Sequence, residues 1–243
     1  MSAAPSLTLR AQIADAARRV ISAEGIITSV AFAICFAVSR WLPVFLAFYV
    51  AALVSYYFAI IHHVGDGDAG LPGPSDASGD WSETLAQVVR GVLCLIAGSL
   101  PLLTYFIANH DFPSPAVTFA LLFAGQLYLP AAILAATLTN TTLVILWPPA
   151  WIALIRRAPM HYAQFTLLWF ASVLVVLCVV LATSPIVDGA LTFAETTETP
   201  LATFGLGAFA ASAIWNLVGF VQAAIVGLFL RQHRAALGWG EPP

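Results

Sequence analysis

The sequence predicts an all-α fold: a polytopic membrane helix bundle of about six transmembrane helices. Of its 243 residues 60% are hydrophobic and only 9% are charged, and the mean hydropathy is +0.91. A soluble domain carries about 25% charged residues, so this chain lacks the polar side chains that a water-exposed globule needs. Several apolar runs also reach the roughly 20 residues that a helix needs to cross a bilayer. We further expect an N-terminal amphipathic helix and a short, proline-broken interfacial or re-entrant segment.

The composition excludes several classes of protein. Disordered chains, coiled coils and nucleic-acid binders need more charge than this sequence has. All nine cationic side chains are arginines, so chemistry that needs a lysine amine, such as a Schiff base or a Walker-A loop, is excluded. The three cysteines, Cys35, Cys94 and Cys178, lie in apolar stretches without a CxxC pair, which favours packing over a disulfide scaffold or a zinc ribbon.

Three parts are predicted along the chain: an amphipathic segment over residues 1–24, a six-span domain over 25–230 and a cytoplasmic tail over 231–243. In the first part apolar residues recur at helical spacing, with the arginines away from that stripe. This pattern fits a helix lying in the membrane interface. It fits equally well a helix packed under the bundle.

The first two predicted spans form a helical hairpin. Residues 25–39 are a short apolar run and residues 41–61 are a full-length one. Between them, Arg40 and Trp41 suit a membrane interface and Pro43 suits the start of a helix. The alternative buries Arg40 in the bilayer, where its cost would mark a functional site.

A polar loop and two further spans follow. Residues 62–80 are rich in Gly, Pro, Asp and Ser, which is typical of a loop. Asp80 and Glu83 have the spacing of a capping box, so a helix starts there in water and becomes apolar over 91–107 as the third span. The fourth span is predicted over 117–136.

The last third of the chain contains a broken segment and two spans. Residues 143–155 are apolar but too short to cross, and Pro148 and Pro149 break them, so they are expected to lie at the interface or to re-enter. The fifth span is predicted over 162–183 and the sixth over 201–230, separated by an acidic loop. Small residues at four-residue spacing permit close helix contact at three pairs: Ala131/Ala135, Gly207/Ala211 and Ala208/Ser212.

The arginines predict the orientation. With six spans and the N-terminus inside, every arginine except Arg40 falls on the inner side. This bias matches the positive-inside rule. We therefore expect a bacterial inner-membrane protein with both termini cytoplasmic.

One cluster has the composition of a metal site. His62 and His63 are followed closely by Asp66 and Asp68. Imidazole and carboxylate groups at such spacing could hold Zn²⁺ or another divalent ion. The alternative is a solvated helix end, because adjacent histidines point in different directions and Asp-Gly-Asp is ordinary turn chemistry.

The middle of each predicted span lacks the groups that most membrane enzymes and pumps use. No histidine lies there to hold a haem, no acidic residue lies there to couple ions, and Ser99 has no histidine partner for a protease. We therefore predict no catalytic residue and no cofactor. The neutral polar residues at mid-span either bridge helices or bind a substrate: Gln126, Tyr128, Trp215, Asn216 and Gln222.

Three stretches together resemble a known family. The first is residues 66–72 with Asp76, Asp80 and Trp81; the second is 127–132 with Trp147-Pro148, residues 155–157 and Tyr162; the third is 227–234 with residues 237–239. Across most of residues 45–239 the chain resembles a bacterial multi-span inner-membrane family of unknown function, similar in outline to Yip-type membrane proteins. The resemblance implies a fold and the absence of enzymatic activity.

The expected function is non-catalytic. An abundance of packing residues and a shortage of ionisable groups favour a scaffold, assembly factor or accessory subunit of a larger membrane complex. Its partners would be the lipid bilayer and other membrane protein subunits, and not nucleic acid. The alternative is a small-molecule or lipid permease or channel with a polar cavity lined by Gln126, Tyr128, Asn140 and Asn216.

Overall fold

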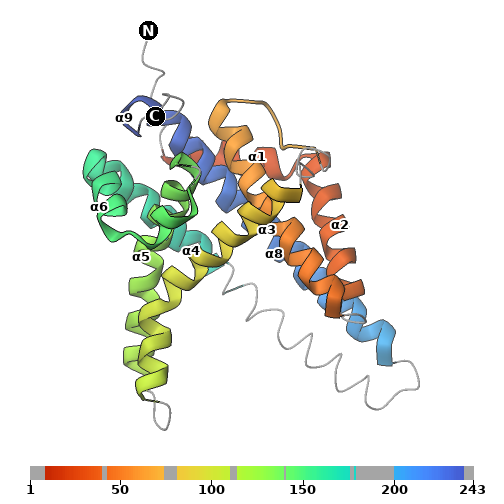
Figure 1. The fold of residues 1–243 in the computed structure, drawn as a ribbon. Helices are drawn as coiled ribbons and strands as arrows, with labels where there is room; N and C mark the ends of the chain where they lie inside the picture. Colours follow the sequence, from red (N-terminus) through yellow and green to blue (C-terminus); the bar gives the residue numbers. More distant parts are fainter. Residues whose placement is uncertain are drawn as a thin grey trace.

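The chain folds into helices, as the sequence predicts (Figure 1). The computed structural model describes residues 9–39, 43–73, 81–109, 114–139, 141–175, 178 and 200–237, and these contain no β-strand. Residues 159–175 are helical as well. The other elements are α1 (Leu9–Val20), α2 (Ala23–Ser39), α3 (Pro43–Asp66), α4 (Trp81–Ala108), α5 (Pro115–Thr139), the 3₁₀ helix η1 (Thr142–Leu146), α6 (Pro148–Arg157), α8 (Pro200–Gln232) and α9 (Arg234–Leu237).

The lengths and the hydropathy of the helices indicate a multi-pass membrane protein. Within the described ranges, four helices are long and apolar enough to cross a bilayer: Val44–Asp66, Ser82–Ala108, Ala116–Thr139 and Phe209–Gln232. A fifth candidate is the pair of α1 and α2, which passes the same test but is bent by 64°. The predicted fifth span over 162–183 is described only in part, and the count of six spans stays a prediction.

The N-terminal helix α1 packs against the bundle. Ala16 and Val20 are fully buried, and α1 lies against α8. The Gln12 side-chain amide donates a hydrogen bond to Gln232 Oε1 at 2.7 Å. A Cβ at Gly25 would overlap the carbonyl oxygen of Val20, so only glycine permits the close turn from α1 into α2. Of the two interpretations of the amphipathic segment, the structure supports the packed one.

Helices α3 and α8 form the centre of the bundle. The rings of Tyr56 and Phe220, both buried, meet edge to face with centroids 5.0 Å apart. Further along, Gly227 brings α8 against the backbone of α3, since a Cβ there would lie 2.8 Å from the carbonyl oxygen of Ile61. Glycine at a helix crossing lets two membrane helices approach closely, which strengthens their van der Waals contact.

A second pair of helices, α4 and α5, forms a hairpin that diverges from α2, α3 and α8 (Figure 1). A Cβ added at Gly125 would overlap the carbonyl oxygen of Gly98, so this crossing requires a glycine on α5. On α4, a Cβ at Gly91 would overlap the Val54 side chain of α3. These two crossings fix the position of α4 relative to both of its neighbours.

The proline-broken segment consists of η1 and α6, which are 5 and 10 residues long. The break falls at Trp147, and Pro148 opens α6, where a missing N–H costs nothing. The Trp151 indole donates to the carbonyl of Val144 at 3.2 Å, and the Trp151 ring stacks on Tyr128 of α5 with centroids 5.0 Å apart. Both pieces are too short to cross a bilayer, as predicted.

Most of the arginines with described contacts gather at one end of the bundle. Arg19 of α1 donates to the carbonyl of Asp68 after α3 at 2.6 Å, and Arg157 of α6 donates to the carbonyl of Leu237 in α9 at 3.3 Å. Arg234 lies 3.8 Å from Asp66. These contacts bring α1, α6, α9 and the end of α3 together, on the upper side of Figure 1.

Candidate functional site

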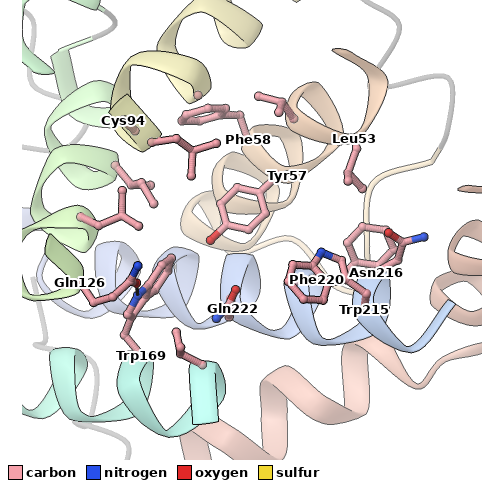
Figure 2. Close-up of a pocket in the computed structure, with 17 residues that line it drawn as sticks. Leu53, Tyr57, Phe58, Cys94, Gln126, Trp169, Trp215, Asn216, Phe220 and Gln222 are labelled. Carbon is pink, nitrogen blue, oxygen red and sulfur yellow. Dashed lines mark hydrogen bonds between the residues drawn. The ribbon is translucent and has the colours of Figure 1, made fainter. Parts of the chain in front are cut away.

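A cavity of about 370 Å³ lies between α3, α4, α5, the helix over residues 159–175 and α8 (Figure 2). Its lining comes from residues 53–58, 91–95, 126–133 and 215–222 of the four candidate spans. Each of these ranges includes the middle of its span. When the helices cross a bilayer, the cavity therefore lies near the centre of the hydrocarbon layer.

The cavity reaches the outer surface of the bundle at that same depth. Seven of its seventeen lining residues are buried and eight are half-buried, whereas Leu95 of α4 is 59% exposed and Trp215 of α8 is 51% exposed. Both residues lie in the central part of their spans. A molecule dissolved in the lipid could thus enter sideways, without passing through either aqueous phase.

The lining is mainly apolar, with a few neutral polar groups. Leu53, Phe58 and Leu129 are typical of the apolar part. Among the described lining residues there is no Asp, Glu, Arg or His. An unpaired charge is very costly to transfer into such surroundings. A ligand of this cavity would therefore be uncharged.

Three polar residues of the lining belong to one hydrogen-bonded chain across three helices. The Trp169 indole N–H donates to Gln126 Oε1 on α5 at 3.0 Å. The Gln222 amide of α8 donates to Ser172 Oγ at 2.8 Å, and Ser172 in turn donates to the carbonyl of Trp169 at 2.6 Å. The chain supplies partners for these groups and fixes their orientation along one side of the cavity.

Tyr57 is the exception in this lining. Its hydroxyl oxygen is buried but has no hydrogen-bond partner in the described part of the chain. In Figure 2 the hydroxyl points into the cavity, toward the side where Trp169 and Gln222 lie. Leaving a buried donor unpaired costs about 1–3 kcal/mol.

The residues predicted to line a polar cavity are only partly brought together. Gln126 and Asn216 both line the cavity, although Figure 2 shows them at opposite sides of it. Tyr128 is not part of the lining and instead stacks on Trp151. Asn140 lies outside the described residues.

Asn216 also has a structural role. Its amide oxygen accepts a hydrogen bond from the Tyr49 hydroxyl at 3.1 Å, and its amide nitrogen donates to the carbonyl of Ser29 at 3.4 Å. It therefore bridges α2, α3 and α8, as a neutral polar residue at mid-span often does.

Sequence reasoning missed Tyr57 and Trp169. Both lie in runs of apolar and aromatic residues. Whether such a ring faces the cavity depends on how the other helices pack, which the sequence alone does not show. The available signal was that Tyr and Trp each carry one polar group, which needs a partner when buried.

The structure does not bring His62, His63, Asp66 and Asp68 together as one metal-binding group. His63 Nδ1 lies 3.4 Å from Asp68, but Asp66 is directed toward Arg234. In the described residues, no three His, Cys, Asp or Glu side chains are arranged to hold a metal ion. The physical reason is that successive helical residues point about 100° apart and that the neighbouring arginine offers Asp66 an ion pair.

Two other histidines meet at the arginine-rich end. The rings of His161 and His233 have centroids 4.4 Å apart, and His233 also packs on Phe229 at 4.7 Å. Burial lowers the pKa of His233, and the neighbouring His161 lowers this pKa further. The neutral form of His233 is therefore favoured in the folded protein.

No family model, no curated protein and no solved structure matches this chain. The resemblance to Yip-type membrane proteins stays a prediction. Functional inference for this protein accordingly depends on the geometry of the cavity.

Proposed function

We propose that the protein binds a neutral, lipid-soluble small molecule in this cavity and acts as a carrier or permease for it. The observation that supports the proposal is an apolar cavity, with a few neutral polar groups, at the middle of four spans. Small-molecule sites are typically cavities of about 300–1,000 Å³ with this kind of lining. Transport of a neutral molecule also needs none of the mid-span acids that ion-coupled carriers use.

The same proposal includes the location and topology. Arginines of α1, α6 and α9 lie at one end of the bundle, and such an excess is typical of the cytoplasmic side. We accordingly propose the bacterial inner membrane, with both termini in the cytoplasm. The role is proposed to be non-catalytic, because the described lining offers no His or carboxylate for proton transfer.

Photolabelling with benzophenone tests the proposal. Benzophenone is neutral and lipid-soluble, and under light it inserts into nearby C–H bonds, so mass spectrometry of the labelled peptides locates it. With the full chain in lipid nanodiscs, we expect saturable labelling on the central parts of α3, α4 and α8. Labelling that rises linearly with concentration, or that falls evenly over the lipid-facing surface, would contradict a binding cavity.

Gly219 provides a variant that fills the cavity. A Cβ added there meets nothing within 4 Å, because Gly219 faces the open space. Gly219→Phe should therefore fold normally and abolish saturable labelling. The matched control is Ile214→Phe on the same helix, since Ile214 is 37% exposed and is not part of the lining. Equal labelling of the two variants would contradict the proposal.

A second candidate is an accessory subunit of a larger complex, and one feature of α4 favours it. Only 11% of the most apolar window of the α4 span is buried, compared with 53% for α5 and 56% for α8. One face of α4 carries large aliphatic side chains at spacings of three and four residues, as in a helix-packing seam. These exposed residues are Leu85, Val89, Val92, Ile96, Leu100, Leu103 and Ile107.

Native mass spectrometry of the complex extracted from its own membrane tests this candidate. We expect a partner subunit to be released by Leu103→Trp on the α4 face. Leu122→Trp on the exposed side of α5 is the control and should leave the complex intact. Recovery of free monomer alone from the unmodified protein would exclude the accessory role.

A further inference from the structure

We infer that the Tyr57 hydroxyl is the recognition group of the cavity, and that the ligand presents a hydrogen-bond acceptor oxygen to it. The ligand class is then a neutral, mainly apolar molecule with a carbonyl oxygen, such as a ketone, a quinone or an ester. The inference rests on the proposed function and specifies which molecules the cavity prefers.

The first step is the hydrogen-bond inventory of the lining. Trp169, Gln126 and Gln222 make hydrogen bonds to one another or through Ser172. Asn216 is bonded to Tyr49 and Ser29. Of the described lining residues, Tyr57 alone has a buried polar atom without a partner. Since buried polar groups are almost always hydrogen-bonded, its partner is expected to come with the ligand.

The second step is the chemistry of the phenol. The ring withdraws electron density from the oxygen, so a neutral phenol is a better donor than acceptor. Its partner is therefore an acceptor. A carboxylate would be the strongest acceptor, but an anion at this depth has no cation among the described lining residues to pair with. A carbonyl oxygen satisfies both conditions.

The third step is the rigidity of the donor. The Tyr57 ring packs edge to face on Phe58 with centroids 6.3 Å apart. The backbone of α3 is held by the close contacts of Val54 with Gly91 and of Ile61 with Gly227. The hydroxyl is therefore positioned before the ligand arrives, and little conformational entropy is lost on binding.

Two further probes test the inference by competition against benzophenone. Diphenylmethane has the same two rings without the ketone oxygen, and 4-benzoylbenzoate adds a carboxylate to benzophenone. For the unmodified protein in nanodiscs we expect diphenylmethane to bind about 10-fold more weakly than benzophenone, as the loss of one hydrogen bond in a dry site predicts. We expect 4-benzoylbenzoate not to compete.

The deciding variant is Tyr57→Phe, which removes only the hydroxyl oxygen. It should bind benzophenone and diphenylmethane equally, and a melt followed by circular dichroism should show no loss of stability. The control is Tyr128→Phe, because this tyrosine lies outside the lining, and it should retain the 10-fold preference that the inference predicts.

The outcomes separate the inference from the function on which it rests. If Tyr57→Phe still prefers benzophenone, the inference is overturned while the cavity remains a binding site. If the unmodified protein binds neither neutral probe saturably, the proposed function itself is wrong. Tight binding of 4-benzoylbenzoate would overturn the neutral ligand class.

Discussion

Within the membrane, α8 contributes to two clusters of neutral polar side chains, and they differ in how completely their hydrogen bonds are used. Asn216 bonds at both ends of its amide, to Tyr49 and to Ser29. Gln222 belongs to the chain through Ser172 and Trp169. Both Asn216 and Gln222 line the cavity, and the unpartnered hydroxyl of Tyr57 points toward the second cluster.

This difference gives a criterion for distinguishing two kinds of polar group inside a membrane: those that only join helices and those that recognise a ligand. In hydrocarbon no water is present to pair a leftover donor, so a cluster that only joins helices should use all of its hydrogen bonds. Asn216, whose amide is bonded at both ends, fits this expectation. A leftover donor beside a cavity instead indicates a place for a ligand.

The largest difference in effect between the two clusters is expected for Gly125→Leu. The added side chain would overlap the Gly98 carbonyl and force α4 away from α5. We expect a loss of about 3 kcal/mol of unfolding free energy in an SDS titration, together with loss of benzophenone labelling. The Asn216 cluster lies on α2, α3 and α8 and would keep its contacts.

The control for this change is Gly219→Leu, the same substitution at a glycine that faces open space. Leucine is the better helix former, so stability should be unchanged or higher. A similar loss of stability for both variants would show that the α4–α5 crossing does not depend on Gly125.

Asn216→Leu should have the next largest effect. The substitution removes the hydrogen bonds to the Tyr49 hydroxyl and to the Ser29 carbonyl, and we expect a loss of about 2 kcal/mol in the same titration. Gln222→Leu removes one described hydrogen bond and should cost about 1 kcal/mol, close to the upper range of such bonds in membrane helices. If Gln222→Leu costs more, the distinction between the two clusters is wrong.

The smallest effect is expected at His233, just beyond the membrane end of α8. Unlike the neutral amides of Asn216 and Gln222, its side chain can be titrated. Its pKa is lowered in the folded state, so folding favours the neutral form. This contribution is fully present above the unfolded pKa of about 6.5 and is lost as the pH falls from there toward the folded pKa.

A thermal melt measures this dependence. We expect the unfolding temperature to be slightly lower at pH 5 than at pH 7. His233→Phe keeps a ring against Phe229 and His161 and should remove that part of the pH dependence. An unchanged profile in the variant would assign the dependence to other groups.

The sequence was sufficient to predict what depends on local composition. The predicted fourth span over 117–136 corresponds to α5 (Pro115–Thr139), and the break before Pro148 lies where the prolines indicate it. Hydropathy and helix punctuation act within one segment, so they can be evaluated without knowing the neighbouring helices.

The helix crossings and the cavity could not be predicted in the same way. The small-residue pairs singled out in the sequence do not include Gly91, Gly125 or Gly227. These glycines contact Val54, Gly98 and Ile61, which lie 37, 27 and 166 positions away in the sequence. Such contacts depend on how distant helices meet. For the same reason Gln126 and Asn216 were identified as polar at mid-span, whereas the orientation of Tyr57 was not.

The sideways opening at Leu95 and Trp215 has a consequence for affinity. A ligand that enters from the bilayer has already left water, and each of its methylene groups favours that partition by about 0.8 kcal/mol. The concentration that the cavity meets is then the concentration in the lipid, which exceeds the aqueous one by orders of magnitude. The apolar lining consequently contributes little selectivity, since lipid tails solvate the same surface equally well. Discrimination between membrane solutes would then depend on a single hydrogen bond. Apparent dissociation constants should also increase in proportion to the amount of lipid in the assay.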